Sequence, residues 1–256
     1  METLRFSLHF FHRQVRTSVR LPSSFFLSVF HPFVWMVLFG SLFQVTASLR
    51  GFPGGSYIQF LAPGIAVMAG LFGATYSGMG TLGDMQSGLL DKFLAAPIPR
   101  ASIIAGPLLN TALNTVVQAA IILATAVWMG ARPRGGVAGV LLVFLVVGML
   151  GSAFSALSHS LALVTRTQRT MVSVVNFISL PLVFMSSMMI ARELMPAWMR
   201  TVSYFNPVDW AVTVSRAAFG GTLGPETWRP VGLLAAVTAV AWIVAVRSLS
   251  YYQRSA

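Results

Sequence analysis

Residues 137–164 read VAGVLLVFLVVGMLGSAFSALSHSLALV, and this run contains no Asp, Glu, Lys or Arg. An α-helix needs about 20 apolar residues to cross the roughly 30 Å hydrocarbon layer of a membrane. In that layer every backbone polar group needs a partner within the protein, and a helix supplies one. The run therefore predicts a transmembrane helix and places the chain among the integral membrane proteins.

Five further segments meet the same criterion. Together they predict an all-α protein with six transmembrane helices, at about residues 25–46, 57–82, 102–129, 137–164, 171–190 and 231–246. No repeat, low-complexity tract or disordered linker separates them, so we expect residues 1–256 to form a single transmembrane domain. An even number of spans places both termini on the same side of the membrane.

The composition is typical of a polytopic membrane protein. Of the 256 residues, 56% are hydrophobic and 9% are charged, whereas about a quarter of a soluble domain is charged. In a soluble protein the net charge of +11 would suggest nucleic acid, but basic residues at the ends of membrane helices face lipid headgroups. We therefore expect a lipid bilayer and no nucleic acid as partner. The absence of Cys excludes disulfides and thiolate metal sites.

The distribution of basic residues indicates the orientation. With cytoplasmic termini, ten of the 17 Lys and Arg residues lie inside and seven lie outside. Cytoplasmic loops of membrane proteins carry the excess of Lys and Arg. We therefore predict that both termini are cytoplasmic.

Residues 1–22 have separated apolar and basic faces. On a helical wheel the His and Arg side chains fill one arc, and the apolar side chains fall within the arc beside it. The apolar residues are Leu4, Leu8, Phe11, Val15 and Val19. This pattern is typical of a helix lying in the membrane interface, and Pro22 ends it. A simple basic anchor before the first span is the alternative.

Residues 191–229 are too polar to span a membrane and too apolar for a free loop. Pro196 and the Asn206–Pro207 pair divide the segment. We expect two short amphipathic helices on the outer side, and backbone that re-enters the membrane is tolerated only where protein or water covers it.

Several familiar chemistries are absent. The chain has no Walker A motif for ATP phosphates. GMGTLG at residues 78–83 matches a dinucleotide-binding pattern, but it ends an apolar helix, so we interpret it as helix packing. No acidic residue lies in the middle of a predicted span, and His159 is the one His in the later spans. An ion-coupled transporter or a membrane enzyme is therefore the weaker alternative, and we expect no catalytic, cofactor-binding or metal-binding residue.

Between the second and third spans, residues 84–100 read DMQSGLLDKFLAAPIPR. Ser87 is the expected cap of a short helix. Its apolar side would be formed by Leu89, Leu90, Phe93 and Leu94, with Asp91 and Lys92 facing away. Pro97 cannot continue a helix. The pattern predicts a rigid cytoplasmic helix joined to two spans, although an ordinary interfacial loop is the simpler interpretation.

This stretch resembles the signature of type-2 ATP-binding-cassette exporter permeases, in particular the daunorubicin-resistance-like branch. The matching residues are Asp84, Gly88, Leu89, Leu90, Pro97, Arg100 and Gly106. NPVDW at residues 206–210, followed by Arg216, is similar to a second element of that family. The family often has Glu where this chain has Asp84, which leaves the ion-pair partner of that carboxylate open.

The resemblance implies a permease dimer in the bacterial cell membrane, driven by a separate cytoplasmic ATPase that binds the ATP, so that this chain holds no cofactor. It implies ATPase coupling through Asp84, Gly88, Leu89, Leu90, Asp91, Lys92, Phe93, Pro97 and Arg100. It also implies a substrate path along the fifth span, past Asn176, Phe177, Phe184, Met185 and Met188. Amphipathic drugs or a secondary metabolite suit such a surface, and a lipid or lipid-linked glycan is the alternative cargo.

Overall fold

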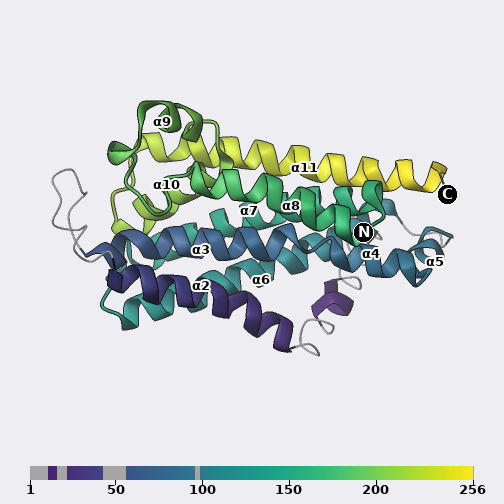
Figure 1. Ribbon diagram of the computed structural model, residues 1–256, viewed down its shortest axis with the longest axis horizontal. Helices are drawn as coiled ribbons and strands as arrows, with labels where there is room; N and C mark the ends of the chain where they lie inside the picture. Colours follow the sequence, from purple (N-terminus) through teal and green to yellow (C-terminus); the bar gives the residue numbers. More distant parts are fainter. Residues whose placement is uncertain (1–10, 16–21, 43–55, 96–98, 256) are drawn as a thin grey trace.

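The computed structural model describes residues 11–15, 22–42, 56–95 and 99–255, and those residues form helices and turns without a strand (Figure 1). Residues 11–15 are helical. The labelled elements are α2 (Pro22–Leu42), α3 (Tyr57–Thr75), α4 (Met79–Gln86), α5 (Leu89–Ala95), α6 (Arg100–Trp128), α7 (Gly136–Thr165), α8 (Gln168–Phe184), η2 (Arg192–Leu194), α9 (Ala197–Ser203), α10 (Pro207–Gly220), η3 (Pro225–Thr227) and α11 (Trp228–Ser255).

The all-helical membrane fold is confirmed. Within the described residues, four stretches are long and apolar enough to cross a membrane: Tyr57–Gln86, Ala101–Trp128, Gly136–Thr165 and Pro225–Gln253. The other two predicted spans correspond to α2, with 21 residues, and to α8, with 17. At 1.5 Å per residue, the 17 residues of α8 rise about 26 Å. The count of six spans therefore stays a prediction.

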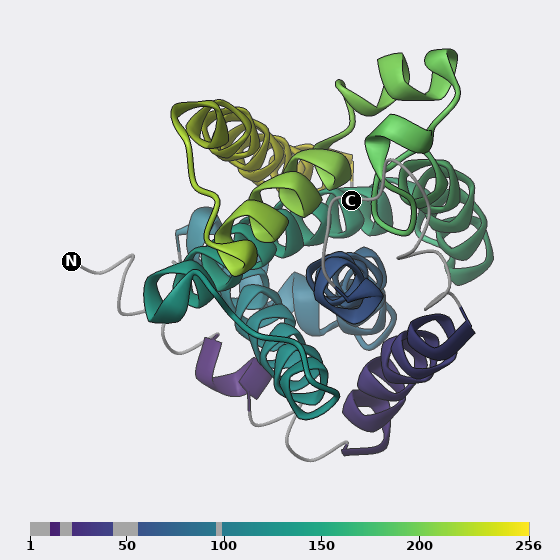
Figure 2. The same cartoon turned by 90° about the vertical axis from the view of Figure 1, so that its left-hand side faces the viewer.

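Helix α3 is the centre of the bundle. Figure 2 shows it surrounded by α2, α6, α7, α8 and α10, and it packs against each of them. In its most apolar window, 78% of the residues are buried. A helix that is apolar on all sides belongs in the interior, which explains why residues 57–75 carry no charged side chain.

The second predicted span is interrupted. Residues 57–82 were expected to form one helix, but α3 ends at Thr75 and α4 begins at Met79. The backbone amide of Met79 donates to the carbonyl of Tyr76, so the carbonyl of Thr75 loses its usual helical partner. Ser158 of α7 donates its hydroxyl to that carbonyl at 2.6 Å and accepts from the amide of Gly78 at 3.0 Å. A side chain on a neighbouring helix thus satisfies the broken turn.

The fifth predicted span, residues 171–190, also ends early, because α8 stops at Phe184. The chain then runs without regular helix to η2. Within residues 191–229 the structure places α9 and α10, and α10 packs against α3, α7 and α11. The predicted N-terminal helix is described only at residues 11–15, so Leu4, Leu8 and Val19 lie outside the described residues.

The bundle has two distinct ends (Figure 1). The coupling end comprises α4, α5, the turn between α7 and α8, and the last turns of α11. The far end comprises the start of α3, the turn between α6 and α7, and residues 185–228. Contacts across each end define the candidate functional sites.

Candidate functional site

The coupling segment forms two short helices joined by a sharp turn. Gly88 between α4 and α5 has φ +66°, a left-handed conformation that glycine adopts without steric cost. Ser87 closes α4 as its C-terminal cap, and its hydroxyl donates to the Asp84 carbonyl. The expected role of Ser87 as N-terminal cap of the following helix was therefore wrong. The left-handed turn at Gly88 separates that hydroxyl from the first turn of α5.

Helix α5 buries one side and exposes the other. Leu90 is 3% exposed and belongs to a buried cluster with Ile104 of α6 and Leu249 of α11. Leu89 is partly buried, and Phe93 and Leu94 pack partly against the same cluster. Lys92 and Asp91 are exposed. The side available to another protein is therefore the charged one, and the apolar side holds α5 against the bundle.

Asp84 of α4 forms an ion pair with Arg13. One guanidinium nitrogen of Arg13 donates to both carboxylate oxygens, at 2.7 and 2.9 Å. The same guanidinium lies 5.1 Å from the centre of the Phe93 ring. A basic face on residues 1–22 was recognised in the sequence, but no spacing rule connects Arg13 with a residue 71 positions away. The helical residues 11–15 thereby contact both short helices of the coupling segment.

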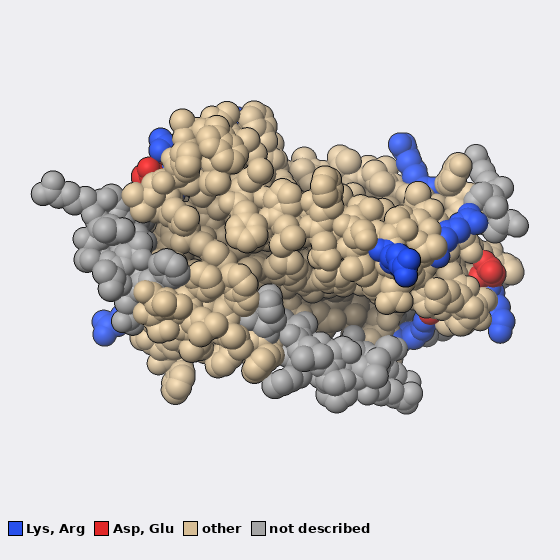
Figure 3. All heavy atoms as spheres, viewed as in Figure 1, with Lys and Arg blue, Asp and Glu red and all other residues tan. Residues whose placement is uncertain are grey.

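Two predicted coupling residues are not placed in full. Pro97 lies outside the described residues, and Arg100 begins α6 without a described side chain. The described coupling residues Asp84, Gly88, Leu89, Leu90, Asp91, Lys92 and Phe93 lie together at the coupling end. Figure 3 shows Lys and Arg gathered at this end, while the middle of the flank carries no charged side chain in that view.

The predicted substrate-path residues differ in their exposure. Phe177 and Phe184 project from α8, with 81% and 62% of their surface exposed. Asn176 is partly buried and accepts a hydrogen bond from the Tyr76 hydroxyl at 2.7 Å, which connects α8 with the break after α3. Met188 is fully buried in the central core. Within one chain, Met188 therefore does not share the exposed surface of the two Phe side chains.

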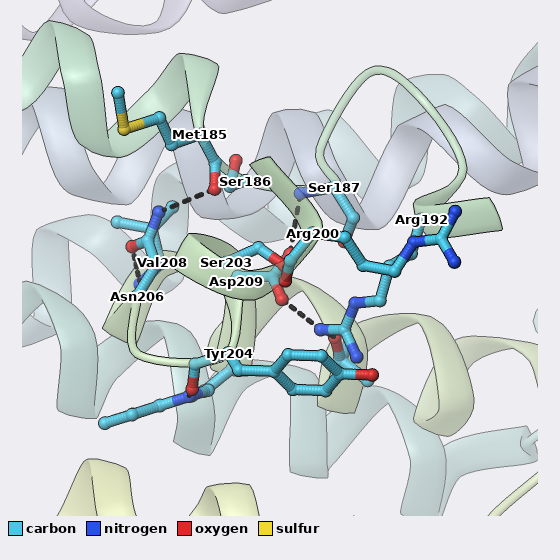
Figure 4. A network of polar contacts seen from close by, with 12 residues as sticks. Met185, Ser186, Ser187, Arg192, Arg200, Ser203, Tyr204, Asn206, Val208 and Asp209 are labelled. Atoms are coloured by element: carbon cyan, nitrogen blue, oxygen red, sulfur yellow. Dashed lines mark hydrogen bonds and ion pairs between the residues drawn. The ribbon is translucent and has the colours of Figure 1, made fainter. Parts of the chain in front are cut away.

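The far end holds a polar network around Asp209, which is completely buried (Figure 4). Its carboxylate accepts from the backbone amide of Ser187 at 2.6 Å and forms an ion pair with Arg192. The Arg192 guanidinium also lies 4.8 Å from the centre of the Tyr204 ring. A buried carboxylate needs such partners, because an unpaired charge in the interior is strongly unfavourable.

Arg216 holds the segment after α8 against α3. Its guanidinium donates to the backbone carbonyls of Phe60 at 3.0 Å and Met188 at 2.5 Å. Burial lowers the pKa of Arg216 to about 9, and Asp209 opposes this shift. The group is therefore charged at neutral pH. Because Gly64 of α3 has no side chain, this segment can pack closely against α3. A Cβ atom at Gly64 would lie 2.7 Å from the Met188 carbonyl oxygen.

Asn206 explains where α8 ends and α10 begins. Its side-chain oxygen accepts from the amide of Val208 at 2.9 Å and so caps α10. Its side-chain nitrogen donates to the carbonyls of Leu182 and Met185, at 2.6 and 3.2 Å. One amide group thus satisfies both helix ends. The NPVDW element and Arg216 connect α10 with α3 and with the end of α8 at the far end of the bundle. The spacing of these residues in the sequence does not indicate those partners.

Within the described part of the chain, no group of three or more His, Asp or Glu side chains could hold a metal ion. His159 is buried, and its Nδ1 lies 2.5 Å from the hydroxyl oxygen of Thr81. This pair joins α7 to α4 beside the helix break.

Comparison with known proteins identifies the family. The family model described as ABC-2 type transporter matches residues 8–219. A Streptomyces coeruleorubidus protein named "Daunorubicin resistance ABC transporter permease protein DrrB1" is 32% identical over 72% of this chain. The match spans 64% of that relative, which is less than two thirds of its length.

A Mycobacterium tuberculosis protein named "Probable doxorubicin resistance ABC transporter permease protein DrrC" is 25% identical over 95% of this chain and 85% of the relative. Both relatives are named as permease proteins, which are transport components rather than enzymes. With a family model that covers most of its length and relatives of this kind, the chain belongs to the ABC-2 type transporter family.

Proposed function

We propose that this chain is the membrane permease subunit of an exporter for amphipathic drugs or a secondary metabolite, driven by a separate ATPase. Membership of the ABC-2 type transporter family supports the permease role. The missing Walker A motif is consistent with a motor on another polypeptide, because ATP phosphates need such a loop. Two permease chains and two ATPase chains would form the working unit.

The observation that carries the proposal is the orientation of α5. Its apolar side is held by α6 and α11, and its charged side, with Asp91 and Lys92, faces outward. Membrane lipid would favour the opposite arrangement, with the apolar side exposed. A groove on a cytoplasmic protein suits a charged, rigid helix end.

A push on α5 has a direct route to the centre of the bundle. The left-handed turn at Gly88 connects α5 to α4, and α4 follows α3 after the break at residues 76–78. The Tyr76 hydroxyl bonds to Asn176 of α8. Movement of the ATPase would therefore shift α4 relative to α3 and reach α8, where the exposed Phe177 and Phe184 lie. ATP changes the equilibrium only if it binds the two states with different affinity.

The names of the relatives favour drugs as cargo, since they refer to daunorubicin and doxorubicin resistance. Planar, amphipathic drugs would bind flexible and aromatic side chains at a surface shared by two protomers. Phe177 and Phe184 of α8 are the strongest candidates for that surface, because each exposes most of its side chain.

The test is reconstitution of the permease in liposomes with an ABC ATPase subunit as its partner. We expect ATP-dependent accumulation of daunorubicin in vesicles, measured by its fluorescence. Lys92→Glu should reduce transport at least about tenfold without changing the unfolding temperature, because Lys92 is exposed and its reversal alters only the docking face.

Arg247→Glu is the matched control, since Arg247 is also exposed near the coupling end but belongs to α11. It should transport like the parent. Equal transport by the Lys92 variant would show that α5 is not the docking face. Accumulation of the drug without any ATPase would refute the proposal as a whole.

A further inference from the structure

Arg166 has an unusual backbone conformation. At φ 54° and ψ 8° it lies in the left-handed region, and it is the one non-glycine residue with positive φ in the described part of the chain. It forms the C-terminal cap of α7, with its amide bonded to the Ala162 carbonyl. Helices usually end this way at Gly or Asn, because a larger side chain clashes with the backbone there.

A contact made by the Arg166 side chain accounts for an arginine at this position. Its guanidinium lies 4.9 Å from the centre of the Tyr252 ring, in the last turns of α11. A guanidinium over an aromatic ring is attracted by the ring's negative face. Strain that persists at one residue is a reason to look for a role of that residue.

Tyr252 continues the contact to the coupling helix. Its side chain is 8% exposed and lies in the same buried cluster as Leu90 of α5 and Leu163 of α7. Its hydroxyl approaches the Asp91 carboxylate of α5 at 3.4 Å. The contacts therefore run from α5 through the end of α11 to the turn that begins α8.

We propose that Arg166 and Tyr252 are positioning residues that transmit movement of α5 to the turn between α7 and α8. This link rests on the proposed role of α5 as the docking face of the ATPase. It provides a second route from α5 to α8, besides the one through α4 and Tyr76. The start of α8 at Gln168 would then move with α5, and the face that carries Phe177 would move with it.

The first test uses the permease alone, in lipid nanodiscs, and measures backbone hydrogen exchange. Tyr252→Ala should speed exchange both in α5 and at residues 163–170, by roughly three- to tenfold. Tyr251→Ala is the matched control, because the neighbouring Tyr251 is 71% exposed, and it should leave both segments unchanged. A faster rate in α5 alone would mean that Tyr252 only packs against α5.

The second test separates transmission from stability. Arg166→Gly relieves the left-handed strain, so the unfolding temperature should stay the same or rise. The same variant should lower daunorubicin transport per ATP hydrolysed about fivefold in liposomes with the ATPase, because the ring contact is lost. A purely structural role predicts that transport follows stability and is retained.

Arg166→Lys keeps the cation over the ring and should restore most of the transport. Arg169→Ala removes an exposed cation from the first turn of α8 and should transport like the parent. Full transport by the Arg166→Gly variant would overturn the proposed link. Failure of the parent to transport with its ATPase would refute the proposed function instead, and the exchange experiment would still decide whether α5 and the turn are coupled.

Discussion

At Gly78 the missing side chain permits contact between two helices. A Cβ atom there would lie 2.3 Å from the Ser158 carbonyl oxygen of α7. Gly78→Ala should therefore destabilise the protein by about 1–3 kcal/mol, as overpacking does. At Gly80 no described atom outside its own stretch of helix backbone lies within 4 Å of the Cβ position, so Gly80→Ala should stabilise α4 by up to about 1 kcal/mol. Unfolding in detergent, followed by tryptophan fluorescence, compares the two variants, and equal effects would contradict this assignment.

Asp209 is a charged residue with no exposed surface. Its carboxylate is fully buried and pairs with Arg192 and the Ser187 amide. Asp209→Ala should cost about 3 kcal/mol, because the guanidinium and the amide lose their partner. Glu193→Ala, at an exposed acid of the same segment, should change stability by less than about 0.5 kcal/mol. Thermal unfolding of the two purified variants measures the difference.

Among the elements, the break between α3 and α4 depends on one side chain of α7. Ser158→Ala removes the partner of both the Thr75 carbonyl and the Gly78 amide. The expected cost is about 1–3 kcal/mol, because both groups are buried. Ser160→Ala removes a hydroxyl that donates to the Ala156 carbonyl of its own helix and should cost less than about 1 kcal/mol. A straightened helix in the Ser158 variant would also slow exchange of the amides at residues 76–79, which hydrogen exchange measures.

The short helix α5 shows how much of its packing the sequence pattern predicts. The spacing of apolar and charged residues indicates which side of the helix is apolar, because residues three or four apart lie on the same face of a helix. It does not indicate whether that side contacts lipid, an ATPase or the rest of the chain. The structure places Leu90 in one buried cluster with Leu249 of α11, a residue far away in the sequence. Ser87 shows the same limit at the helix end, because the left-handed turn at Gly88 changes which helix it closes.

For the whole molecule, six spans predict that the two ends of the bundle lie on opposite sides of the membrane. The chain contains no Cys, so a single introduced thiol reports its own side. Trp198→Cys, at an exposed residue of α9, should react with a membrane-impermeant maleimide in intact cells. Lys92→Cys should react only after the cells are permeabilised. Labelling of both variants in intact cells would contradict the six-span arrangement.

The apolar composition of each segment determines where the membrane helices lie, whereas contacts between distant segments determine where some of them end. Apolar runs such as residues 137–164 predict the membrane helices directly, because the hydrocarbon layer imposes a length and excludes charge wherever the run occurs. The same local rule indicates neither the break within the second span nor the early end of the fifth. The ends of α3 at Thr75 and of α8 at Phe184 depend on Ser158 and Asn206, which satisfy the freed backbone groups from other parts of the chain.

The sequence likewise identifies charged residues of interest, whereas their partners depend on the packed structure. Periodicity and family signatures identified Asp84, Arg216 and the basic face of residues 1–22 as notable, since each stands out against an apolar background. Their partners, Arg13 for Asp84 and the Phe60 carbonyl for Arg216, emerge once the helices are packed. Hydropathy acts on each segment independently, whereas an ion pair or a capped carbonyl depends on the distance between atoms that folding brings together.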